Sequence, residues 1–271
     1  MERYLRSNQA LWDLWARHHV ASPMYDLEGF KAGRRAGREA LDALEVRLVG
    51  DVAGRSLLHL QCHFGLDTLA WARRGAAVTG VDFSGDAIAA ARALSEELHI
   101  PATFIQADVY DLPERLDGEF DIVFASHGVL CWLPDLDRWA RVAARFLRPG
   151  GRFCLIEGHP FPLVFDDETP GRELRIAFPY FHADDPVRAE RRGSYAVPDG
   201  QFDSVTYEWA HPLSDVIGAM LRAGLRITSF DEYPYVGWPM FPWMEARPDG
   251  TWRWPGDAPS PPLMYSLTAG K

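Results

Sequence analysis

Residues 57–84 read LLHLQCHFGLDTLAWARRGAAVTGVDFS, which places two short apolar runs on either side of a segment that favours a helix. Apolar runs of this length, at 56–60 and 77–81, are typical of strands buried on both faces of a sheet. The segment at 66–74 predicts a helix that ends at Gly75. A strand, a helix and a strand in this order predict parallel strands joined by a right-handed crossover.

The same alternation of strands and helices extends through most of the chain. Further helices are expected at 84–98, capped by Ser84, at 135–147 and at 213–223, and further strands at 103–106, 120–125, 152–156, 226–233 and 263–268. Residues 2–49 also read as helical, with interruptions near Pro23 and Gly29. From 158 to 211 the pattern breaks down, and only 204–209, SVTYEW, reads as a strand, an isolated one. The chain is therefore predicted to be an α/β protein with a doubly wound, mostly parallel sheet.

The composition limits the classes of function. Of 271 residues, 47% are hydrophobic, which is enough for a sizeable core. The formal net charge of −10 argues against nucleic acid as the main partner, because proteins that bind it usually carry a basic excess. Two arginine clusters are expected to be solvated faces, namely Arg34, Arg35 and Arg38, and Arg188, Arg191 and Arg192.

The cysteines and the apolar segments bear on the location of the protein. Cys62, Cys131 and Cys154 lie far apart, so they give neither a disulfide framework nor a zinc site. The N-terminal segment lacks the apolar stretch of a signal peptide, and no apolar run is long enough to span a bilayer. We therefore expect a cytoplasmic protein that does not enter a membrane, and the sequence leaves its oligomeric state open.

Three loops are expected to meet at the edge of the sheet where the parallel strands end. The loop at 61–65, QCHFG, precedes a helix whose first backbone N–H groups are free to bind a ligand. Asp82 ends the second strand, and a carboxylate there can accept hydrogen bonds from both hydroxyls of a ribose. Asp108 follows the third strand, and its carboxylate and the Val109 N–H suit an adenine amino group and ring nitrogen. Together the loops predict a site for an adenosine cofactor.

These motifs resemble those of class I S-adenosylmethionine-dependent methyltransferases. Residues 57–84 resemble the first two cofactor motifs of that family, and IQADVYDLP, at 105–113, resembles its adenine motif. FDIVFASHGVLCWLPD, at 120–135, followed by LRPGGRF, at 147–153, resembles its fourth strand, the following helix and the entry to its fifth strand. The resemblance implies the strand order 3-2-1-4-5-7-6 in a seven-stranded sheet and S-adenosylmethionine as the cofactor. It also implies cofactor contacts from Gln61, Cys62, His63, Gly65, Asp82, Phe83, Asp108, Val109 and Ser126.

The loop after the first strand departs from the pattern of the family. The family has glycine where this chain has Gln61 and His63, and an acidic residue where it has His59, whereas Gly65 is kept. Because glycine permits close backbone approach and positive φ, the methionine end of the cofactor is expected to be held differently here. The loop cannot supply the GxGxxG fingerprint of a nicotinamide-dependent dehydrogenase, which argues against that alternative.

Candidate catalytic residues follow the third, fourth and fifth strands. Transfer of a methyl group from a sulfonium mainly needs proximity, orientation and a water-poor site, and it needs a base only where the acceptor loses a proton. The candidate bases are His127, Glu157, His159 and Asp111, and we single out His159 because its ordinary pKa suits proton removal at neutral pH. The segment ASHGVL, at 125–130, offers no carboxylate ligand for magnesium, so no metal is expected.

The chain is expected to have four parts. Residues 1–55 form an N-terminal helical lid, 56–157 the cofactor-binding core, 158–211 an insertion that covers the acceptor cleft, and 212–271 a C-terminal helix and antiparallel strands that complete the sheet. The expected activity is transfer of a methyl group to a small molecule, in a pocket lined in part by the many aromatic residues. Two alternatives stay open: different chemistry with the same cofactor, and cofactor binding without catalysis.

Overall fold

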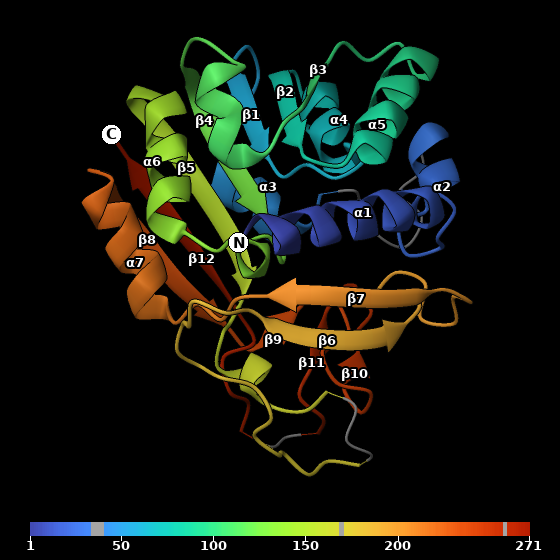
Figure 1. Ribbon diagram of the computed structural model, residues 1–271. Coiled ribbons are helices and arrows are strands. Elements are labelled where there is room, and N and C mark those ends of the chain that lie inside the picture. Colours follow the sequence, from blue (N-terminus) through green and yellow to red (C-terminus); the bar gives the residue numbers. More distant parts are fainter. Residues whose placement is uncertain (34–40, 168–170, 257–258) are drawn as a thin grey trace.

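The computed structural model describes residues 1–33, 41–167, 171–256 and 259–271, so the cluster of Arg34, Arg35 and Arg38 lies outside the described residues. A seven-stranded sheet forms the centre of the molecule (Figure 1). Its strands are, in spatial order, β3 (Thr103–Gln106), β2 (Ala77–Asp82), β1 (Ser56–Leu60), β4 (Phe120–Ser126), β5 (Leu147–Gly158), β12 (Met264–Gly270) and β8 (Arg226–Tyr233). Counted along the chain, this order is 3-2-1-4-5-7-6, as predicted.

The first five strands of the sheet are parallel. β1 pairs in parallel with β2 on one side and with β4 on the other, and β3 and β5 extend the sheet in the same sense. β12 pairs antiparallel with both β5 and β8. Because parallel strands end at a common edge, the loops that follow β1, β2, β3 and β4 meet there.

Helices cover both faces of the sheet. α4 (Leu66–Arg73) and α5 (Gly85–Glu97) contribute to the core on one face, and α6 (Leu136–Phe146) and α7 (Leu213–Arg222) to the core on the other. The predicted cap of α5 is confirmed, because Ser84 Oγ accepts from the Ala87 N–H at 3.1 Å. Asp135 caps α6 in the same way, with its carboxylate 2.8 Å from the Arg138 nitrogen.

The strand sequence places alternate side chains in these two cores. Along β4, Ile122 and Phe124 belong to the core with α4 and α5, whereas Val123 and Ala125 belong to the core with α6 and α7. All four side chains are buried. A near-continuous apolar strand is required here because helices cover both of its faces.

The N-terminal helices are α1 (Glu2–His19), α2 (Leu27–Lys31) and α3 (Ala43–Val49). α3 begins with a capping box, in which Asp42 accepts from the Glu45 N–H at 2.7 Å and Glu45 accepts from the Asp42 N–H at 2.6 Å. α1 packs against α5 and against the segment that follows β5 (Figure 1). The first 33 residues therefore contact two regions that are far away in the sequence.

The segment after β5 contains a two-stranded antiparallel sheet. β6 (Val187–Arg192) pairs with β7 (Asp203–Glu208). The strand expected at 204–209 is therefore present within one residue of that position, but the expectation that it has no partner is wrong. The sequence does not reveal β6 because most of its side chains are exposed and charged. Asn8 of α1 binds both the N–H and the C=O of Tyr207, at 3.0 and 2.7 Å, and so fixes β7 to α1.

A second small sheet lies near the C-terminus and was not predicted. β10 (Glu245–Ala246), β11 (Trp252–Arg253) and β9 (Tyr235–Val236) form it in that order. Each strand has two residues, which is too short for an alternating pattern to appear in the sequence. Among the helices that the structure describes, none has the length and apolar character that crossing a membrane requires.

Substitutions of Trp71 test the packing of the core beside α4. The Trp71 ring is fully buried against Phe124, with ring centroids 5.8 Å apart, and its Nε1 has no hydrogen-bond partner. Trp71→Ala should lower the free energy of unfolding by about 3–5 kcal/mol, measured by urea denaturation. Trp71→Phe should cost less, because it keeps a ring and removes an unpaired N–H. Equal losses in the two variants would contradict this account of the packing.

Candidate functional site

A cavity of about 810 Å³ lies at the edge where the parallel strands end. Its wall includes the loops after β1, β2, β3 and β4, together with side chains of α1, β6 and β7. α1 lies between the main sheet and the β6–β7 pair (Figure 1), and residues from all three parts line the cavity. All the predicted cofactor-binding residues line it: Gln61, Cys62, His63, Gly65, Asp82, Phe83, Asp108, Val109 and Ser126.

The loop after β1 has left-handed backbone conformations at three positions. The φ angle is 56° at Gln61, 52° at His63 and 77° at Gly65, which precedes α4. A Cβ atom at Gly65 would lie 2.6 Å from the Phe104 ring, so glycine is needed there. At the other two positions the left-handed conformation costs about 1–2 kcal/mol for each residue with a side chain. The loop therefore keeps the backbone course of a glycine-rich loop while it carries two polar side chains.

Two polar side chains near this loop are engaged in other contacts. The amide of Gln61 donates to the Val129 carbonyl at 3.1 Å and accepts from Trp139 Nε1 at 3.0 Å. His59 binds Thr68 at 2.9 Å, and burial lowers its pKa to about 3, which keeps it neutral where the family has an acid. Both side chains are therefore held in place by protein contacts.

Asp82 is a buried carboxylate at the end of β2. Its Oδ2 accepts from the His63 N–H at 2.8 Å, and its Oδ1 accepts from the Ser84 N–H at 2.9 Å. Burial raises its pKa to about 6, and the two N–H donors oppose that rise. Because each carboxylate oxygen can accept more than one hydrogen bond, Asp82 can also accept from hydroxyl groups in the cavity.

Asp108 occupies the corresponding place after β3. Its Oδ1 accepts from the Tyr110 N–H at 2.9 Å and so caps the short 3₁₀ helix η1 (Val109–Glu114). Burial raises the pKa of Asp108 above its usual value. The hydrogen bond to Tyr110 fixes the orientation of a carboxylate that lines the cavity beside Val109.

Ser126 ends β4 and His127 follows it, and the start of α3 lies beside His127. His127 Nε2 is 3.4 Å from Glu45 Oε1 and 3.9 Å from Asp42 Oδ2. Glu45 is only 2% exposed, and its Oε1 has no hydrogen-bond partner. An imidazole and two carboxylates within 4.8 Å of one another resemble the donor set of a divalent-cation site. The absence of a carboxylate near 125–130 is therefore no longer an argument against a metal, because α3 supplies two.

Glu157, at the end of β5, shapes the loop after β4. Its Oε2 accepts from the Gly128 N–H at 2.8 Å, and its Oε1 accepts from the N–H groups of Val129 and Leu130 at 2.7 and 3.0 Å. Burial raises the pKa of Glu157, and these three donors oppose the rise. The geometry assigns Glu157 to holding this loop in place, although it also lines the cavity.

His159 and Asp111 lie outside the cavity wall. His159 accepts from the Phe161 N–H at Nδ1, 3.1 Å away, and its Nε2 lies 2.8 Å from Glu232. Asp111 pairs with Arg138 at 3.2 Å on the surface. This placement corrects the expectation that both side chains face the cleft. The reason is that the backbone of His159 follows β5 toward β12, where its N–H donates to the Leu263 carbonyl at 2.9 Å.

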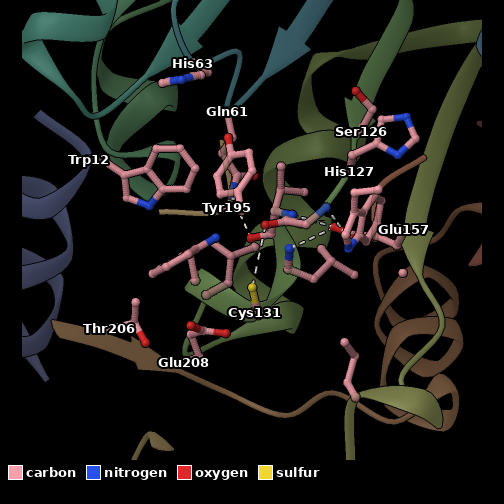
Figure 2. A pocket seen from close by; sticks show the side chains of 18 of the residues that line it. Trp12, Gln61, His63, Ser126, His127, Cys131, Glu157, Tyr195, Thr206 and Glu208 are labelled. Atoms are coloured by element: carbon pink, nitrogen blue, oxygen red, sulfur yellow. Dashed lines mark hydrogen bonds between the residues drawn. The ribbon is translucent and has the colours of Figure 1, made fainter. Parts of the chain in front are cut away.

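Several cavity residues were not identified from the sequence. They are Glu45 of α3, Ser194 in the loop after β6, and Thr206 and Glu208 of β7. His19 of α1 is fully buried and contacts two cavity residues, Ser194 and His63. Burial raises the pKa of Glu208 above its usual value. Figure 2 shows Thr206 and Glu208 on the side of the cavity opposite His63. For His19 a signal exists, because it extends the stripe of Trp12 and Trp15 along one face of a helix.

Comparison with known proteins bears on the core of the chain. Residues 58–155 match the family model described as a methyltransferase domain. The ubiquinone biosynthesis O-methyltransferase of Proteus mirabilis strain HI4320 is 34% identical over 133 residues, which are 49% of this chain and 54% of that protein. The protein of the same name from Pseudomonas aeruginosa strain LESB58 is 28% identical over 144 residues, 52% of this chain and 56% of that protein. The chain thus spans about half the length of the curated relatives it matches.

Solved structures resemble this chain over a greater length. An S-adenosylmethionine-dependent methyltransferase from Mesorhizobium loti has a TM-score of 0.54 at 20% identity and covers 83% of this chain and 94% of its own. DhpI, in a complex named DhpI-SAM-HEP, has a TM-score of 0.56 at 17% identity, and the match covers 99% of this chain and 98% of the DhpI chain. At these identities the likeness establishes the fold, including the parts before β1 and after β5.

Replacement of Glu157 by glutamine tests its structural role. Glu157→Gln keeps the shape of the side chain but turns one acceptor oxygen into an NH₂ group that faces backbone donors. The free energy of unfolding should fall by about 1–3 kcal/mol, measured by urea denaturation, because a buried donor loses its partner. The exposed Glu96 serves as the control, and Glu96→Gln should change stability by less than about 0.5 kcal/mol. A Glu157→Gln variant as stable as the control would remove Glu157 from this role.

Proposed function

We propose, on the premise that residues 58–155 form a class I S-adenosylmethionine-dependent methyltransferase domain, that this chain transfers a methyl group to a small molecule. One observation carries the proposal. Asp108, Asp82 and the loop at 61–65 line a single cavity at the ends of the adjacent strands β3, β2 and β1. That order supplies acceptors for an adenine, then for a ribose, and then a loop beside the remaining part of the cofactor.

The polar groups of the cavity fit such a cofactor. Asp82 and Asp108 keep acceptor capacity beyond their backbone hydrogen bonds, and Ser126 lies at the end of the neighbouring strand β4. Bound S-adenosylmethionine would supply an activated methyl group with its leaving group already in place. The residues of this chain would bind and orient that group and exclude water from it.

We propose that residues 1–55 and 158–211 act as a cover over the acceptor. Figure 2 shows Trp12 of α1 and Tyr195 of the segment after β6 around the same cavity as Thr206 and Glu208. A partly open cavity with aromatic side chains in its wall suits a small organic molecule better than a polymer. The names of the relatives, with ubiquinone biosynthesis as their process, support a small-molecule acceptor, and the accepting atom is left to experiment.

His127 is our candidate for the base where the acceptor must lose a proton. It lines the cavity, whereas His159 does not, and Glu45 lies 3.4 Å from its Nε2. Positioning alone would suffice for an acceptor that carries no proton to be removed.

The proposal is tested by cofactor binding and by product analysis. S-Adenosylhomocysteine should bind with a dissociation constant in the micromolar range, about −7 to −8 kcal/mol by titration calorimetry. Asp82→Ala should weaken binding by about 1.5–3 kcal/mol, through loss of hydrogen bonds to a charged acceptor. With methyl-labelled S-adenosylmethionine and a panel of small phenols, acids and amines, mass spectrometry should find a labelled product. If calorimetry detects no adenosine ligand, the proposed function fails.

The same binding experiment has a predicted pH dependence. The ionised form of Asp82 accepts hydrogen bonds from hydroxyl groups, and burial raises its pKa to about 6. As the pH rises from 5 to 7, Asp82 loses its proton and affinity should increase by about tenfold. Asp82→Asn cannot ionise, so its affinity should change much less over this range. An equally steep pH profile in that variant would assign the effect to another group.

The base is tested with His127→Asn, because asparagine tolerates the left-handed conformation that His127 adopts at φ 50°. With an acceptor that loses a proton, turnover should fall by about 10²- to 10⁴-fold while affinity for S-adenosylhomocysteine stays unchanged. Each measurement is repeated after treatment with EDTA. Loss of wild-type turnover on chelation, with recovery on addition of Mg²⁺, Mn²⁺ or Zn²⁺, would assign Asp42, Glu45 and His127 to a cation and contradict the role of base. Unchanged turnover in His127→Asn would mean that catalysis depends only on the positioning of the cofactor and the acceptor.

A further inference from the structure

The pairing of β6 with β7 places one row of side chains on the cavity wall. Thr206 and Glu208 are two positions apart on β7, so their side chains leave the same face of the pair. The register sets Ala189 of β6 opposite Thr206 and Val187 opposite Glu208. All four residues line the cavity, and Figure 2 shows Thr206 and Glu208 on the side opposite His63. This face of the pair therefore lies across the cavity from the loop after β1.

The carboxylate of Glu208 has lost hydration without gaining a basic partner. Burial raises its pKa, whereas the Thr206 hydroxyl and the charge of Arg191 act in the opposite direction. Arg191 is itself engaged, because its guanidinium donates to both oxygens of Asp167, at 2.7 and 3.3 Å. Among the residues that the structure describes, no ion pair involves Glu208. A ligand that brings a positive charge would stabilise a carboxylate in this state.

Other carboxylates of the cavity wall differ from Glu208 because backbone donors already bind them. Asp82 accepts from two backbone N–H groups, and Glu157 accepts from three. Beside Glu208 lies instead the thiol of Cys131, which is neutral because burial raises its pKa well above the usual value. The charge of Glu208 is therefore available to a ligand that enters the cavity.

Aromatic rings form another part of the same wall. Trp12, Trp132 and Tyr195 line the cavity, and Trp132 directly follows Cys131, whose thiol lies beside Glu208. The ring centroids of Trp12 and Trp132 are 5.3 Å apart, and those of Trp12 and Tyr195 are 6.4 Å apart. Aromatic rings pack against apolar groups and attract cations. The wall thus combines an acidic group with rings that suit an apolar body.

We propose that Glu208 binds a protonated amine of the methyl acceptor, so that the acceptor is a small amine with an apolar or aromatic body. The inference rests on the proposed function and names the class of molecule that the same site takes. The cofactor occupies the side of the cavity formed by the loops after β1, β2 and β3, and the acceptor occupies the side formed by β7. The contact sets the specificity for the acceptor and does not take part in the transfer step.

Three probes with a common body separate the effect of charge from that of shape. Tyramine, 4-ethylphenol and 3-(4-hydroxyphenyl)propionate share a phenol ring with a two-carbon chain, and at neutral pH the chain ends in a cation, no charge and an anion, respectively. Affinities are measured by titration calorimetry with S-adenosylhomocysteine saturating the cofactor side. Tyramine should bind at least about tenfold more tightly than 4-ethylphenol, and the propionate should bind most weakly. Tyramine that binds no better than the other two probes, or does not bind, would overturn the inference.

Replacement of Glu208 by glutamine keeps the size of the side chain and removes its charge. Glu208→Gln should weaken tyramine by about tenfold to hundredfold, the range for a hydrogen bond to a charged group. It should leave 4-ethylphenol and S-adenosylhomocysteine within about twofold. The matched control is Glu190→Gln, which removes an exposed carboxylate of β6 that is not part of the cavity wall. This control should leave tyramine within about twofold.

The two variants distinguish the possible outcomes. Unchanged affinity of Glu208→Gln for tyramine would overturn the inference, while the proposed function stands. An equal loss for tyramine and S-adenosylhomocysteine would place Glu208 at the cofactor and would overturn it as well. An equal loss of tyramine affinity in Glu190→Gln would assign the effect to net charge, with the same consequence. Failure of S-adenosylhomocysteine to bind the wild-type chain would instead overturn the proposed function.

Discussion

The carboxylate of Asp82 is the interaction on which the rest of the site depends. It ends β2 and accepts from the backbone N–H groups of His63 and Ser84, at 2.8 and 2.9 Å, so it joins the loop after β1 to the start of α5. A buried carboxylate is costly unless hydrogen bonds compensate for its lost hydration, and here the donors come from the backbone. Burial raises the pKa of Asp82 to about 6, although the two backbone donors act in the opposite direction. The ribose hydroxyls of the proposed cofactor would supply the donors that remain missing.

From this loop, polar contacts extend into the segments that cover the cavity. His63 is held at a φ of 52°, and its ring reaches His19 of α1. α1 is attached to the main sheet as well, because Gln9 donates to the Phe83 carbonyl at 2.7 Å. Asn8 and His19 connect the same helix to the segment after β5, through Tyr207 and Ser194. One helix therefore contacts both the loops after β1 and β2 and the segment after β5, so movement of that segment would disturb contacts beside these loops.

Several buried titratable groups in this chain have structural roles. Glu157 accepts three backbone N–H groups and shapes the loop that carries His127. His59 is neutral and bound to Thr68, and both ring nitrogens of His159 have partners outside the cavity. His127, with Glu45 beside it, differs from these because it lines the cavity next to a carboxylate oxygen that has no hydrogen-bond partner. His127, which lines the cavity beside the Glu45 carboxylate, is therefore the residue whose catalytic role should be tested.

The order of the seven strands followed from the resemblance to a known family. The sequence by itself determined the alternation of strands and helices, the cap of α5, and the set of loops at the strand ends that line the cavity. These features are local, since apolar runs, capping residues and polar residues directly after a strand act over a few positions. Tertiary structure alone decided that His159 turns away, that β6 pairs with β7, that Glu45 and Ser194 reach the cavity, and that His19 lies between Ser194 and His63. The contacts of Glu45, His19 and Ser194 join residues 44 to 175 positions apart, and the direction of His159 depends on which way the chain leaves a strand, so no local pattern encodes them. The sequence predicted helical structure within residues 2–49, but only packing against the loop after β1 brings His19 of α1 to His63.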